Sequence, residues 1–171
     1  EILLRPFQFC NLTEAVIRPE DKLKDLKRKV RIATFLGTVQ STLTNFRYLR
    51  AIWRKNCEEE RLLGVSLTGI MTNELTARHN NGALLADLRN TARDENLKYA
   101  EVLGINPSAA ITCVKPSGTV SQLVDTSSGI HPAYAHHYIR RVQCDVKDPL
   151  TTFMINAGVP HEPLSTKPDQ V

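Results

Sequence analysis

Residues 109–124, with the sequence AAITCVKPSGTVSQLV, constrain the fold more than any other segment of the chain. A short apolar run leads into a turn of lysine, proline, serine and glycine at residues 115–118, and an amphipathic run follows. This order predicts a strand, a loop and a helix. Backbone N–H groups at a helix N-terminus lack intrahelical partners, and the helix dipole favours negative charge there. The segment therefore predicts an anion-binding loop, with phosphate as the commonest biological occupant.

An ordinary βα-loop with a Ser or Thr N-cap would show the same spacing, so the residues of this segment leave both interpretations open. The rest of the chain decides which architecture surrounds the loop.

Hydrophobic periodicity predicts the remaining elements. Pro19 at a helix start, with acidic residues after it, begins the first long helix. The expected helices are residues 20–43, 48–55, 83–103, a helix after the 115–118 turn, and a helix from Pro149 to about residue 156 with Asp148 as N-cap. The expected strands are residues 62–71, 109–114 and 138–144, with a polar connector at 58–61 and extended segments and loop at 1–18.

Strands that alternate with helices predict an α/β fold with a largely parallel sheet. Ligands of such sheets bind where the βα-loops gather, at the C-terminal ends of the strands. The alternation therefore places three segments on one functional face: residues 117–121, residues 127–131 and the end of the 62–71 strand.

Composition excludes several classes of protein. Apolar residues make up 42% and charged residues 23%, as in ordinary soluble domains. The chain has no apolar run long enough to span a membrane, and its first residues lack the features of a signal peptide and an initiator Met, so we expect a segment of a longer cytoplasmic protein. The net charge of +4 comes mainly from residues 22–31 and 47–55, where aliphatic residues at helical spacing predict solvated helix faces and no nucleic-acid contact.

The four cysteines, Cys10, Cys57, Cys113 and Cys144, match no zinc spacing, and a reducing cytoplasm disfavours disulfides. The neighbouring His136 and His137 point to different sides if they lie in a strand, so they cannot share a metal. We therefore expect no metal site.

Four segments together resemble ribonucleotide reductase, most closely its monomeric, adenosylcobalamin-dependent (class II) branch. They are EILLRPFQFCNLT at residues 1–13, ERLLGVSLTGIM at 60–71, KPSGTVSQ at 115–122 and SSGIHPAYAHHYIRRV at 127–142. The resemblance implies that residues 1–171 are the C-terminal part of a catalytic ten-stranded α/β barrel. It extends over essentially the whole chain, with the segments in the family's order.

The resemblance also implies roles for residues. Glu1 matches the catalytic carboxylate, and Cys10 matches one of two thiols that become a disulfide on turnover. The other three cysteines match no active-site position and are expected to be structural. The substrate-phosphate loop matches Lys115, Pro116, Ser117, Gly118, Thr119, Val120 and Ser121.

The implied activity is reduction of ribonucleoside triphosphates, with adenosylcobalamin as cofactor and a thioredoxin-like dithiol protein as reductant. The radical cysteine, its asparagine partner and the region for a deoxynucleotide effector are absent, so the chain alone is expected to be inactive. Two alternatives stay open: the large subunit of an iron-dependent (class I) reductase, and a non-catalytic α/β module that binds nucleotide phosphates.

Overall fold

The computed structural model describes residues 2–115 and 117–171. They divide into two compact units, and the boundary along the chain falls between residues 133 and 134. The elements of the first unit are β1 (Asn11–Val16), α1 (Leu23–Gln40), α2 (Ala51–Glu60), β2 (Leu63–Thr68), the 3₁₀ turn η1 (Ile70–Thr72), α3 (Glu74–Ala77), α4 (Gly82–Leu103) and α5 (Val120–Leu123). The second unit contains α6 (Pro149–Asn156). Within the described residues no helix is both long enough and apolar enough to cross a membrane.

The first unit is built on a parallel sheet, as the sequence predicts. β1 pairs with β2 in the register Leu12 to Gly64 and Glu14 to Ser66. Residues 110–113 extend the sheet on the other side of β2, where Val65 N–H donates to Ile111 O at 2.8 Å and Cys113 N–H to Val65 O at 3.0 Å. This predicted third strand is reduced to a single bridge between Val65 and Thr112.

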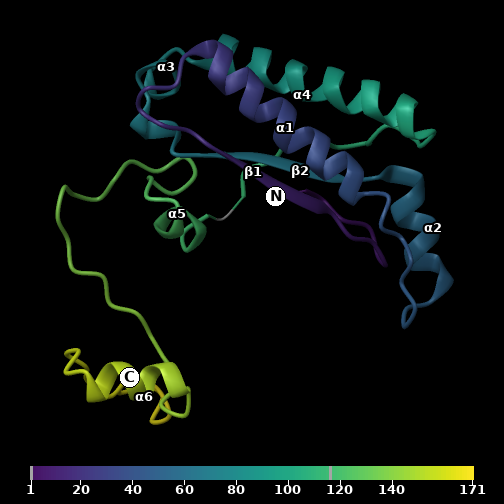
Figure 1. Cartoon of the computed structure of the whole chain (residues 1–171). Helices are drawn as coiled ribbons and strands as arrows, with labels where there is room; N and C mark the ends of the chain where they lie inside the picture. The colour runs from purple at the N-terminus through teal and green to yellow at the C-terminus, as the bar shows by residue number, and fades with distance from the viewer. Residues whose placement is uncertain (1, 116) are drawn as a thin grey trace. The chain divides into compact units, whose positions relative to one another are not determined.

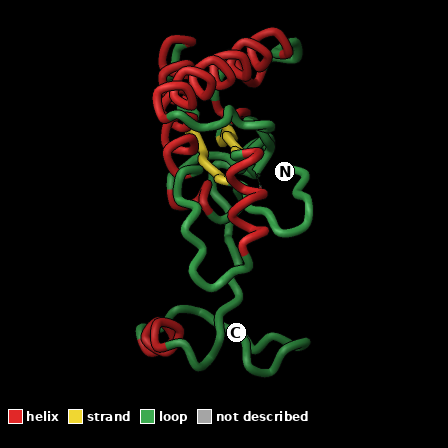
Figure 2. Tube along the Cα trace, turned by 90° about the vertical axis from the view of Figure 1, so that its right-hand side faces the viewer, coloured by secondary structure: helices red, strands yellow, loops and turns green. Residues whose placement is uncertain are grey.

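Helices α1 and α4 lie side by side over one face of the sheet (Figure 1), and Figure 2 shows the same layering from a second direction. The core beneath them contains Ala15, Ala33, Leu63 and Val65. Gly37 of α1 lies over Leu63 of β2, and a Cβ at Gly37 would make an ordinary contact of 3.4 Å with Leu63 Cδ2. The two helices therefore cover one face of the sheet, and the candidate site described below lies on the other face.

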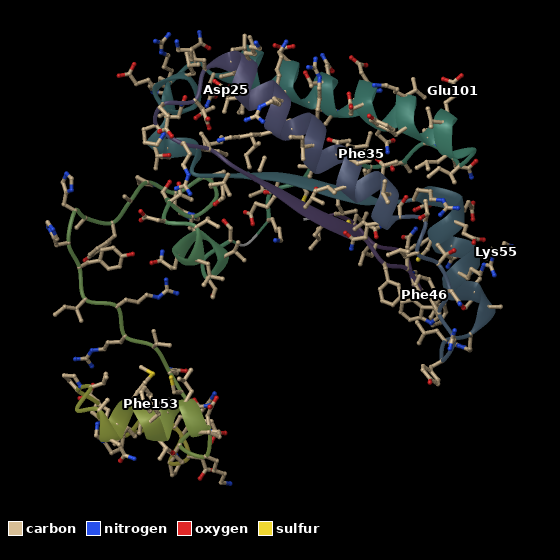
Figure 3. All side chains as sticks on the ribbon, in the orientation of Figure 1. Asp25, Phe35, Phe46, Lys55, Glu101 and Phe153 are labelled. Carbon is tan, nitrogen blue, oxygen red and sulfur yellow. The ribbon has the colours of Figure 1, made fainter. Side chains whose placement is uncertain are left out.

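A buried amide fixes the two long helices to each other. Asn96 of α4 is 1% exposed, and its Nδ2 donates to Thr38 Oγ1 of α1 at 2.9 Å and to Ser108 Oγ at 3.0 Å. Its Oδ1 accepts from Ser108 N–H at 2.9 Å. Near the same interface Phe35 of α1 meets Tyr99 of α4 with ring centroids 4.6 Å apart (Figure 3). The side-chain nitrogen and the side-chain oxygen of Asn96 therefore both have hydrogen-bond partners, as a buried amide requires.

The predicted helices are confirmed, with shifts at their ends. α1 begins at Leu23, three residues later than predicted, because Asp21 accepts from Arg18 N–H in a preceding turn and Asp25 accepts from Lys22 N–H. The connector predicted at residues 58–61 is wrong, because α2 continues to Glu60 and ends at Arg61 in the left-handed conformation. Gly104 ends α4 in the same left-handed conformation.

The strand predicted at residues 138–144 is wrong. These residues form a loop, and Ile139 is 94% exposed. A strand exists only through pairing with a neighbour, and an alternating pattern alone cannot supply one. The second unit instead has a bridge between Asp145 and Gln170, and Asp148 caps α6 as predicted by accepting from Leu150 N–H.

Candidate functional site

The candidate site lies on the sheet face opposite α1, which we call the loop face. β1 contributes Leu12 and Glu14 to it, and β2 contributes only the small residues Gly64, Ser66 and Thr68. Side chains from the flanking segments reach over these small residues. The contacts fall into three groups, one at each small residue of β2.

Two thiols meet at Gly64. A Cβ placed on Gly64 would lie 3.3 Å from Cys10 Sγ and 3.0 Å from Cys113 Sγ, with Leu12 Cδ2 at 2.4 Å. The lack of a side chain at Gly64 therefore lets thiols from two separate segments approach across β2. Cys10 was predicted as a site residue, whereas Cys113 was expected to be structural, and the structure places both on the loop face.

Helix α2 holds the segment that leads to Cys10. Asn56 Nδ2 donates to Pro6 O at 3.0 Å, and Gln8 Nε2 donates to Glu60 Oε2 at 2.6 Å. Phe9 N–H donates to the buried Cys57 Sγ at 3.3 Å. The Phe9 ring stacks on Trp53 at 4.6 Å and contacts Phe46, which Figure 3 labels beside α2. These contacts hold the segment before Cys10 against α2, with Trp53 as an aromatic anchor.

An ion pair crosses β2 at Ser66. Lys115 Nζ lies 3.3 Å from Glu14 Oε2, and the side chains are 21% and 7% exposed. Lys115 N–H donates to Ser66 Oγ at 3.1 Å. The first residue of the predicted phosphate loop is thus fixed to both strands.

The predicted phosphate loop divides into buried and exposed residues. Ser117 and Ser121 are 1% and 0% exposed, whereas Gly118, Thr119 and Val120 are exposed. Ser121 Oγ donates to Gly118 O at 3.1 Å, so its hydroxyl stabilises the turn. The helix that follows has only four residues, shorter than the amphipathic run suggests, so its dipole is small. An anion at this loop would depend on local N–H groups and neighbouring charge more than on a helix dipole.

Thr68 joins this loop to the second predicted loop. Its Oγ1 lies 2.9 Å from Ser117 Oγ, accepts from Gly129 N–H at 2.9 Å and donates to Ser127 O at 3.1 Å. The end of β2 and the two loops therefore meet on one face, as predicted. The strand predicted at residues 62–71 is shorter than expected, because the chain turns at Gly69 into η1. Thr68 and Glu14 were not identified from the sequence, although the alternation of small residues at positions 64, 66 and 68 was a usable signal.

Two predicted site residues, Glu1 and Pro116, lie outside the described residues. Among the described residues no group of three or more His, Cys, Asp or Glu could hold a metal ion. The side chains of His131, His136 and His137 are exposed. Within α2, Glu58 has a lowered pKa because Thr44 and Arg54 donate hydrogen bonds to its carboxylate.

The chain is similar to known proteins over most of its length, although no family model matches it. An adenosylcobalamin-dependent ribonucleoside-triphosphate reductase of Lactobacillus acidophilus is 30% identical over 192 residues, which cover 95% of the chain and 25% of that relative. The protein of the same name from Euglena gracilis is 29% identical, with 97% of the chain and 22% of the relative covered. The chain thus spans about a quarter of the length of these relatives.

The fold also has a solved counterpart. The crystal structure of a B12-dependent (class II) ribonucleotide reductase matches 98% of this chain and 27% of that chain, with a TM-score of 0.68 and 22% sequence identity. This likeness shows the fold of the layer described above.

Proposed function

We propose that the chain is a part of an adenosylcobalamin-dependent ribonucleotide reductase, to which its relatives and its fold are similar, and that it forms part of the substrate site of a ribonucleoside-triphosphate reductase. The observation that carries this proposal is the loop face itself. It gathers Cys10 from the start of β1 and the 117–121 loop from the far end of the described sheet onto one surface. A thiol and a phosphate-binding loop on one surface fit a nucleotide whose phosphates bind at one end and whose ribose reacts at the other.

The proposed chemistry reduces C2′ of the ribose. The C2′–O bond breaks, a C2′–H bond forms, the oxygen leaves as water, and two thiols become a disulfide. Cys10 supplies one thiol, and a cysteine outside this chain supplies the other. Glu1 is the carboxylate that takes the 3′-OH proton, which requires an ionised group within hydrogen-bond reach. A thioredoxin-like dithiol then reduces the disulfide by exchange.

Adenosylcobalamin supplies the radical that starts this reaction when it is bound. One groove, of about 430 Å³, runs along the outer side of β1 and is lined by Thr13, Glu14, Arg18, Lys29 and Leu36, with Val16, Ile32, Ala33 and Ala15. This groove follows a sheet edge and does not open onto the thiols, so we assign the corrin to other parts of the enzyme.

The groove fits a different occupant, a further strand of the catalytic barrel. Thr13 Oγ1 and Glu14 Oε1 are buried without a hydrogen-bond partner among the described residues, and both belong to residues that line the groove. β1 forms the outer edge of the described sheet, and an open edge offers backbone N–H and C=O groups to a neighbour. We propose that a barrel strand from the rest of the protein pairs with β1.

The test uses the full-length enzyme and ribonucleoside-triphosphate reduction with a dithiol reductant. Cys10→Ser should abolish multiple turnover, whereas Cys144→Ser, a matched change in the second unit, should leave it intact. Turnover that survives Cys10→Ser would remove the redox role from Cys10. Turnover without added adenosylcobalamin would contradict the cofactor assignment.

A further inference from the structure

The hydroxyl of Thr68 makes three contacts that use its whole hydrogen-bonding capacity. A hydroxyl has one proton and two lone pairs. Its proton goes to Ser127 O at 3.1 Å, and Gly129 N–H donates to one lone pair at 2.9 Å. Ser117 Oγ, at 2.9 Å, must then be the donor to the other lone pair. The Ser117 proton is thus directed at Thr68 and is not available to a phosphate oxygen.

Backbone contacts close the two loops around this hydroxyl. Gly69 N–H donates to Ser127 O at 2.9 Å, and Thr126 N–H donates to Ser121 O at 3.1 Å. Gly129 adopts a left-handed φ of 49°, and a Cβ there would lie 3.3 Å from Ser117 Oγ. Glycine is therefore favoured at position 129 both by its conformation and by the closeness of the 117–121 loop.

We infer that Thr68 is a positioning residue for the substrate's phosphates, an inference that rests on the function proposed above. Thr68 is 0% exposed, so its role in binding is indirect. It acts through Ser117 and Gly129, which hold the neighbouring exposed residues 118–120 in one geometry. The thiol of Cys10 lies at Gly64, near the opposite end of β2 from Thr68, so the chemistry at the ribose does not depend on this hydroxyl.

The test compares Thr68→Val with Thr68→Ser in the full-length enzyme. Valine keeps the shape but leaves two buried donors, Ser117 Oγ and Gly129 N–H, without their acceptor, while Ser127 O keeps the hydrogen bond from Gly69 N–H. We therefore expect a rise in KM for the ribonucleoside triphosphate of about tenfold with kcat largely kept. Serine keeps the hydroxyl and should restore KM. Equilibrium binding separates phosphate positioning from general damage: Thr68→Val should weaken binding of the triphosphate and leave binding of the unphosphorylated nucleoside unchanged.

Two further variants complete the test. One controls for the loss of a buried hydroxyl, and the other replaces Thr68→Val if that variant does not fold. Thr91→Val removes a buried hydroxyl from α4, where Thr91 Oγ1 donates to Asp87 O at 2.9 Å, and should not change KM. Gly129→Ala displaces the loops without altering β2, and should raise KM selectively for the triphosphate even if Thr68→Val does not fold.

The outcomes separate the two proposals. Triphosphate binding by the wild type together with equal binding by Thr68→Val and Gly129→Ala would overturn the positioning role and leave the proposed function standing. Equal losses in Thr68→Val and Thr91→Val would also overturn it, because the effect would then be one of stability. A wild type that binds no nucleotide would overturn the proposed function itself.

Discussion

The ammonium group of Lys115 lies 3.3 Å from the carboxylate of Glu14, although a hundred positions separate the two residues in the sequence. The Lys115 side chain reaches from the third segment of the sheet, over Ser66 of β2, to β1. Both charged groups are largely buried, so the pair links the outer strand to the start of the predicted phosphate loop.

Removing one charge of this pair should be costly. In Glu14→Gln the Lys115 ammonium keeps its burial but loses its counter-charge, and we expect a loss of about 1–2 kcal/mol in the free energy of unfolding, less than for a fully buried pair. Urea denaturation measures the loss. The control is Glu162→Gln, whose pair with Arg141 is exposed and should contribute nothing measurable. Equal stability of the two variants would show that burial adds nothing to the Glu14 pair.

Two glycine substitutions should have different effects on stability. Gly64→Ala puts a methyl group 2.4 Å from Leu12 Cδ2 and 3.0 Å from Cys113 Sγ, and overpacking of this kind costs about 1–3 kcal/mol. Gly37→Ala meets only ordinary contacts from 3.4 Å outward and improves helix propensity, so it should be neutral or stabilising by up to about 1 kcal/mol. Thermal unfolding midpoints measure both, and a tolerated Gly64→Ala would contradict the close packing at β2.

The thiols of Cys10 and Cys113 should be linked by a short bifunctional thiol reagent, because both lie within 3.3 Å of one point above Gly64. Peptide mass spectrometry after digestion identifies the cross-linked pair. Cys113→Ser should abolish the cross-link, and Cys144→Ser should not. A cross-link from Cys10 to Cys57 in the native protein would contradict the placement, because Cys57 is 7% exposed and lies against Phe9 N–H.

Asn96 should be among the most sensitive polar positions of the first unit. Asn96→Ala leaves Thr38 Oγ1, Ser108 Oγ and Ser108 N–H without their amide partner, and we expect a loss of about 3 kcal/mol in the free energy of unfolding. Asn90→Ala, an exposed change on the same helix, should cost far less. Denaturation of the two variants side by side tests the difference.

The lowered pKa of Glu58 predicts a dependence of stability on pH. The hydrogen bond from Thr44 is the main cause, with Arg54 second, and both stabilise the ionised form. This contribution is complete above the ordinary glutamate pKa of 4.5 and is lost as pH falls through the lowered value. In Thr44→Val, unfolding midpoints should therefore fall less on acidification than in the wild type. An unchanged acid dependence would assign it to other carboxylates.

The helices and their ends were predictable because the sequence signals for them lie within a few residues of one another. The apolar period of α1 and α4, the glycine that ends α4 and the Asp148-Pro149 start of α6 depend on residues within one or two turns. The 138–144 prediction failed for the complementary reason: alternation describes a possible strand, and the described residues supply no neighbouring strand there.

The sequence by itself determined the parallel α/β layer, the turn at residues 115–118 and, through resemblance, the importance of Cys10. Only the tertiary structure decided what surrounds them. It placed Cys113 beside Cys10, paired Lys115 with Glu14, and turned the Ser117 hydroxyl toward Thr68. These relationships join segments far apart in the chain, and they depend on the register of β1, β2 and residues 110–113, which no local pattern specifies.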